Sequence, residues 1–351
     1  MNEHLPSPMH ARLLAFALLT TVVLGVWLRW FLAGTLALPM SFTHLRHAHS
    51  HLGYFGLLFP LAWIAWRRLG APAPQGRALA VYATATLLAF VGFLRAGYGP
   101  EAIVGSTVVG AVWLGSAWRT RAHLRSRDHP LAPILPGVIV AEACIPPIAI
   151  LLRRQPDVAA AFVATFLAAL LFAVLVPSAL AACDARLGSW PLFFGGAIAA
   201  SAAIGVWDSP LTRVGMSVYA LMLGRIAWRM HAPISLRGAW GAVSVGVLAM
   251  ALGILPNVRP VAIGAIHFMI LGPVLASLAP HWLRWNPPEP VWLLSHGSVA
   301  VLAGALVAQG LGFGSWTAVG AALGGSGVAL FWVLLIGSSW LLGPRLTRPA
   351  R

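Results

Sequence analysis

The sequence contains very few acidic residues and no lysine. Only 8 of its 351 residues are Asp or Glu, and charged residues make up 9% of the chain, which is about a third of their share in a soluble globular domain. This composition excludes a water-soluble enzyme and a solvated disordered chain. The chain has only two cysteines, Cys144 and Cys183, and both lie in apolar runs, so a disulfide framework is excluded as well.

Apolar residues make up most of what is present. They account for 59% of the chain, and the mean hydropathy is +0.84. Because a backbone in lipid has to satisfy its own hydrogen bonds, each apolar run of about 20 residues is expected to form one transmembrane helix. The sequence therefore predicts an all-α integral membrane bundle, in which residues 1–351 form a single polytopic domain of about twelve spans. The predicted spans are 11–37, 42–66, 78–96, 100–119, 131–152, 157–182, 189–207, 210–230, 236–255, 259–283, 290–312 and 315–342.

The basic residues indicate how these spans are oriented. All 23 are arginine, and the formal net charge is +15. If the N-terminus is cytoplasmic, sixteen arginines lie at cytoplasmic span ends and five at outer ends, while Arg29 and Arg46 fall inside spans. Cytoplasmic ends of membrane helices are enriched in basic residues, so both termini are predicted to be cytoplasmic, in the inner (plasma) membrane. The charge is thus explained by topology and a lipid bilayer partner, without nucleic acid.

Four histidines open the second predicted span within eight residues. At 100° per residue, His44, His47 and His51 share a stripe about 60° wide, and His49 points about 140–200° away from it. A histidine inside a bilayer is costly and is a candidate for function. Neutral imidazole is a ligand for haem iron, copper and zinc. The stripe therefore predicts metal binding, and polar residues at the outer mouth of the helix are the structural alternative.

Two further histidines lie in later spans. His51 is nine residues and His267 eight residues past the start of its span, which places both about 12–14 Å below the outer boundary. Two imidazoles at one depth on different helices can clamp a planar haem from both faces. His296 is predicted to lie in the inner half of the membrane, as a further metal candidate or a satisfied core residue. Arg46 and Arg259, near the outer boundary, are predicted to pair with haem propionates.

These residues resemble those of known families. A His cluster in the second of twelve helices and a His in the tenth resemble the subunit I fold of haem-copper oxidases and nitric oxide reductases. The run from His49 to Gly56 is similar to the His-x-His-Leu-Asn-Leu-Leu-Gly run of short subunit-I-like proteins, which implies His51 and His267 as the axial ligands of a low-spin haem. The run from His47 to His49 resembles the His-Ala-His of NnrS proteins, as does the stretch 221–283, and this implies haem and copper chemistry linked to nitric oxide.

The sequence departs from these families in two respects. The NnrS motif continues His-Ala-His-Glu-Met, whereas this chain has Ser50-His51 after His49. Residues 130–230 contain no histidine, whereas a haem-copper oxidase needs further histidines there for its copper. We therefore expect a haem b protein that handles electrons or a diatomic gas such as nitric oxide and lacks the usual binuclear centre, with copper at His44 and His47 as an option. No catalytic residue is predicted. The alternatives are a copper or zinc transporter or metallochaperone that uses the His cluster, a metal-dependent membrane enzyme, and a structural or assembly role.

Overall fold

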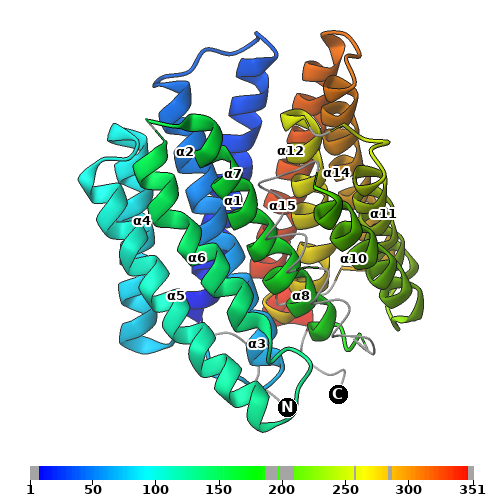
Figure 1. Ribbon diagram of the computed structural model, residues 1–351. Helices are drawn as coiled ribbons and strands as arrows, with labels where there is room; N and C mark the ends of the chain where they lie inside the picture. Colours follow the sequence, from blue (N-terminus) through cyan, green and yellow to red (C-terminus); the bar gives the residue numbers. More distant parts are fainter. Residues whose placement is uncertain are drawn as a thin grey trace. The chain divides into compact units, whose positions relative to one another are not determined.

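The structure is a computed structural model that describes residues 8–152, 154–185, 197, 209–256, 258–283 and 287–346. Within these ranges all regular secondary structure is helical (Figure 1). The chain divides into two compact units. Unit 1 consists of Met1–Ile64, Pro74–Val112 and Val258–Arg351, and unit 2 of Ala65–Ala73 and Trp113–Asn257.

Most helices lie wholly in one unit, and the boundary between the units falls inside α3 and α5. The elements that begin in unit 1 are α1 (Pro8–Leu32), α2 (Phe42–Leu52), η1 (Gly53–Leu58), α3 (Phe59–Arg68), α4 (Gly76–Ala96), α5 (Pro100–Ser126), α12 (Arg259–Met269), η3 (Ile270–Val274), α13 (Leu275–Leu278), η4 (Ala279–His281), α14 (Glu289–Gly310) and α15 (Trp316–Leu346). The elements of unit 2 are α6 (Ile134–Leu151), α7 (Pro156–Ala168), η2 (Ala169–Leu175), α8 (Val176–Ala182), α10 (Pro210–Arg229) and α11 (Ile234–Ala251).

The apolar helices make this a multi-pass membrane protein. Among the described residues, nine helices are long and apolar enough to cross a membrane. The rods at 42–68 and 210–229 are helical but less apolar, because the first begins with four histidines and an arginine and the second carries three arginines. The predicted span 189–207 lies outside the described residues apart from residue 197. The count of twelve spans stays a prediction.

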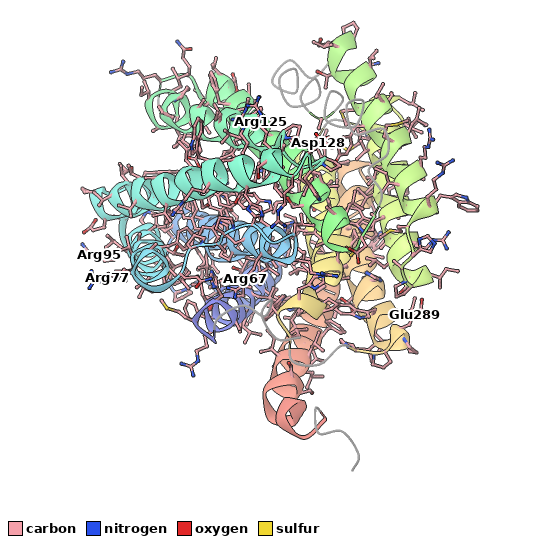
Figure 2. The ribbon with its side chains drawn as sticks, turned by 90° about the horizontal axis from the view of Figure 1, so that it is seen from below. Arg67, Arg77, Arg95, Arg125, Asp128 and Glu289 are labelled. Atoms are coloured by element: carbon pink, nitrogen blue, oxygen red, sulfur yellow. The ribbon has the colours of Figure 1, made fainter. Side chains whose placement is uncertain are left out.

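The orientation of the helices in a membrane also stays a prediction. Within unit 1, the first turn of α1 and the last turn of α15 lie at the same end (Figure 1), as an even number of crossings requires. Arg77 and Arg95 stand near opposite ends of α4 and are exposed on its outer side (Figure 2). Arg95 pairs with Glu101 at 3.3 Å.

Unit 1 brings α1, α2, α12, α14 and α15 together. α1 packs on α2, η1 and α15, while α14 packs on both α12 and α15 (Figure 1). The approach of α12 to α14 is close at Gly264, where a Cβ atom would lie 3.0 Å from the carbonyl oxygen of Ala303. Helices pack this closely where one of them presents a residue without a side chain.

Three of the helical rods contain a π-helical segment, and each segment has a proline inside it or two residues after its end. Pro60 follows η1, Pro177 follows η2, and Pro273 lies inside η3. Proline cannot donate the usual i→i−4 hydrogen bond, so the backbone widens locally and some carbonyl groups are freed. The hydroxyl of Tyr82 donates to the carbonyl of Phe55 in η1, and that of Tyr219 donates to the carbonyl of Phe172 in η2.

Candidate functional site

The four histidines of α2 face two different neighbourhoods. On one side, the ring of His51 stacks on Phe93 of α4, with centroids 3.9 Å apart and an interplanar angle of 3°. His44 lies on this side too, since a Cβ atom at Gly97 would be 3.4 Å from its Cδ2 atom. On the other side, His49 contacts α1 and α12. The two faces follow the helical period of the sequence.

His49 lies next to His267 of α12. Their ring centroids are 6.5 Å apart, and the ring planes are nearly parallel, at 9°. His49 Nδ1 is 3.0 Å from the carbonyl oxygen of Thr21 in α1, and His267 Nδ1 is 2.7 Å from that of Ile263, one turn earlier in its own helix. A carbonyl can only accept, so each Nδ1 donates and each Nε2 keeps its lone pair. The pair therefore presents two ligand nitrogens from two helices.

The fit of His49 against α1 depends on a glycine. A Cβ atom at Gly25 would lie 3.0 Å from His49 Cε1, so any larger residue at position 25 would push the imidazole ring away. Gly25 is one turn after Thr21, whose carbonyl orients the same ring. α1 thus sets both the position and the tautomer of His49, in the way that outer-shell groups orient metal-binding histidines.

His51 belongs to a separate aromatic cluster with His47, Phe93 and Tyr98. Its Nε2 is 3.1 Å from the hydroxyl of Tyr98, and the ring of His47 lies edge-on to Tyr98 at 4.8 Å. The Nδ1 atom of His51 is buried and has no hydrogen-bond partner among the described residues. Burial raises the pKa of Tyr98, against a smaller opposing effect of the positive charge of Arg46, so the phenol stays protonated at neutral pH.

The structure thus brings His49 next to His267, whereas the sequence predicts that His51 is the partner of His267. The two positions are two residues apart, which is about 3 Å along the helix axis, so depth alone does not distinguish them. They point in nearly opposite directions, and the face of α2 that meets α12 follows from long-range packing. The helical period distinguishes His49 only by its isolation on the face opposite the stripe.

Positive charge lies next to the His49–His267 pair at Arg29, and Arg259 and then Arg46 follow Arg29 in a chain of mutually repelling arginines. The charge of Arg259 interacts with those of Arg29 and Arg46, and Arg29 also interacts with both histidines of the pair. No carboxylate forms an ion pair with any of these arginines in the described part of the chain. Sequence reasoning named Arg46 and Arg259 but left out Arg29, although an arginine inside an apolar span is itself a signal of function.

His296 of α14 lies apart from the pair. It is next to Gly272, where a Cβ atom would be 3.8 Å from its Cδ2 atom, and Gly272 follows His267 by five residues along the chain. Both ring nitrogens of His296 are buried without a hydrogen-bond partner among the described residues. Across the described ranges, no group of three or more His, Cys, Asp or Glu side chains is placed to hold a metal ion. What the described residues offer is two adjacent imidazoles, those of His49 and His267.

No protein family, curated protein or solved structure matches this chain. The resemblance to haem-copper oxidases and NnrS proteins therefore remains a prediction from short motifs.

Proposed function

We propose that this chain is a membrane protein that binds haem b through His49 and His267 and handles single electrons. The observation that carries the proposal is the pair itself, with near-parallel rings 6.5 Å apart and both Nδ1 atoms on backbone carbonyls. Two imidazole nitrogens on opposite sides of one metal, each about 2 Å from it, would place their ring centroids about 6 Å apart. The observed spacing fits such an arrangement.

The number of protein ligands also supports haem over a bare metal ion. Structural zinc sites use four protein ligands and catalytic sites three, and no group of three is present in the described residues. A haem brings four nitrogens of its own and requires at most two from the protein. Copper bound by His44 and His47 finds no such support, and a transporter that uses the His cluster stays the alternative.

The arginines suit the propionate groups of a haem. Arg29, Arg46 and Arg259 form no ion pair with a carboxylate in the described part of the chain, and their charges oppose one another. Carboxylates pair well with guanidinium groups, often in bidentate fashion. Haem propionates at the outer end of the pair would neutralise this cluster, and we add Arg29 to the two arginines that the sequence predicts for this role.

Two histidines committed to one haem favour electron handling over gas binding. A haem held by both His49 and His267 would supply one-electron redox chemistry, and these residues would leave no ligand position for nitric oxide. His267 is held by a carbonyl of its own helix, whereas His49 is held across an interface with α1. The protein supplies orientation, charge compensation and a water-poor setting, as in other cofactor sites. A role with nitric oxide remains the second reading of the same site.

The direct test is the haem content of the purified protein. We expect a Soret band and a pyridine haemochrome of the b type, with both absent from His49→Ala and His267→Ala proteins. The His51→Ala protein is the matched control, because it removes a histidine of the same helix from the other face and should retain haem. A colourless wild-type protein that contains stoichiometric copper or zinc by elemental analysis would refute the proposal and favour the transporter alternative.

A further inference from the structure

The corner between α10 and α11 in unit 2 combines exposed apolar side chains with arginines. Trp228 is 78% exposed and Ile234 is 75% exposed, and Arg225 and Arg229 are exposed on the last turns of α10. We call these residues, together with Arg237, the α10–α11 corner. Large apolar groups at such exposure are unfavourable in water and normal against lipid.

Arg237 is held in a defined position over Trp228. Its Nη2 donates to the carbonyl of Trp228 at 2.8 Å, and its Cζ lies 5.8 Å from the centroid of the Trp228 ring. The carbonyl belongs to the C-terminal turn of α10, where the helix dipole favours a cation. The guanidinium has further N–H donors beyond the one that this carbonyl accepts.

The arginines of this corner form no ion pair with a carboxylate among the described residues. Residues 209–256 contain no Asp or Glu. The ion pairs Arg68–Asp184 and Arg95–Glu101 do not involve the corner. Three arginines on one helix corner create a positive potential that attracts an anion from outside the chain.

The end of α5 repeats the arrangement. Trp118 is 60% exposed, and the Cζ atom of Arg121 lies 6.0 Å from its ring centroid. In both places the tryptophan stands in an Ala-Trp-Arg triplet at the C-terminal part of a helix. A tryptophan ring at the acyl boundary with an arginine beside it at phosphate level is the arrangement expected at a membrane interface.

We propose that the α10–α11 corner binds the headgroup phosphate of an anionic phospholipid. Arg229 and Arg237 contact the phosphate, and Trp228 and Ile234 lie against the glycerol and upper acyl chain. A free phosphate would pair with the arginines but leave Trp228 and Ile234 in water. A lipid would contact both the arginines and these apolar side chains, so it is the better-fitting ligand. Basic residues near a membrane surface each contribute about 1 kcal/mol toward anionic lipid. The site lies in unit 2 and does not depend on haem.

The test is lipid titration of the purified full-length protein in detergent, followed by thermal unfolding and by native mass spectrometry. Phosphatidylglycerol should raise the unfolding temperature in a saturable way, and phosphatidylcholine of the same chain length should not. The Arg229→Gln/Arg237→Gln double variant should bind phosphatidylglycerol about thirty-fold more weakly. Arg95→Gln is the matched control, since Arg95 is exposed but already paired with Glu101, and its affinity should be unchanged.

Three outcomes would overturn the proposal. The first is a double variant that elutes and unfolds like the wild type and binds phosphatidylglycerol equally well. The second is equal protection by soluble glycerol phosphate, which would indicate a free-anion site. The third is unchanged affinity in Trp228→Ala, because an apolar contact with the lipid would then be absent. If the double variant fails to fold, Arg237→Lys is tested instead. It keeps the positive charge but loses the planar set of guanidinium N–H donors, and it should still bind phosphatidylglycerol more weakly than the wild type.

Discussion

The two faces of α2 carry the same residue type in different chemical settings. On the face toward α12, His49 donates through Nδ1 to a carbonyl, keeps Nε2 free and lies parallel to a second imidazole. On the face toward α4, the Nε2 of His51 is occupied by Tyr98 and its ring is stacked on Phe93. The comparison teaches that a histidine cluster in a membrane helix divides into ligand candidates and packed residues according to which ring nitrogen its neighbours occupy.

The largest expected effect comes from removing a ligand and returning it. His49→Gly should abolish the Soret band, and added imidazole should restore it, because the cavity would admit a free ligand at the same place. His51→Gly should keep its Soret band without imidazole. Absorbance titrations with imidazole measure both variants. Equal loss of haem from the two variants would break the distinction between the two faces.

A smaller effect is expected at the glycine that accommodates His49. Gly25→Ala adds a methyl group 3.0 Å from His49 Cε1, which should displace the ring and weaken haem binding by about tenfold, equivalent to about 1.4 kcal/mol. Gly337→Ala in α15 is the matched control, since nothing lies within 4 Å of its added methyl group. That change should leave haem affinity as it is and stabilise the helix by up to about 1 kcal/mol. Haem dissociation rates measured by transfer to apomyoglobin compare the two.

On the other face of α2, the expected effect is on stability alone. Tyr98→Phe removes the hydrogen bond to His51 and should lower the free energy of unfolding by about 1 kcal/mol. Its haem spectrum should match that of the wild type. Thermal unfolding in detergent and an absorbance scan of the same sample test both statements, and a shifted Soret band would mean that the faces are coupled.

The smallest effect is a dependence of stability on alkaline pH. Because burial raises the pKa of Tyr98 in the folded state, its contribution is fully present below the unfolded-state pKa of about 10. It is lost as the pH rises from there through the folded pKa, since the unfolded chain ionises first. Unfolding curves from pH 8 to 11 should show a shallower decline for Tyr98→Phe than for the wild type. Parallel curves would mean that other groups determine the decline.

Local signals in the sequence predict several of these features well. Apolar runs predict the helical rods, and the 100° period separates His49 from the stripe of His44, His47 and His51. The prolines near the three π-helical segments of the described residues do not predict those segments by themselves, since α6 contains Pro146 and Pro147 and remains an α-helix. The rods and the histidine stripe each depend on one continuous stretch of the chain.

The features that the sequence did not predict depend on distant parts of the chain. Arg29 joins the site from α1, more than two hundred residues before Arg259. The carbonyl that orients His49 comes from Thr21, and the hydroxyl that occupies His51 comes from Tyr98. The predicted depth below the outer boundary is almost the same for His49 and His51, since they are less than one helical turn apart. The choice between them requires knowing which helix packs on which face.

Hydrophobicity and helical period are local properties of the chain, and they predict a membrane protein, its helical rods and its candidate histidines. Helix packing places His49 beside His267 and adds Arg29 to arginines that pair with no described carboxylate. Packing also places His51 against Tyr98 and Phe93. A helix presents all its faces equally until its neighbours pack. Its neighbours then determine which nitrogen is hydrogen-bonded and which remains free to bind.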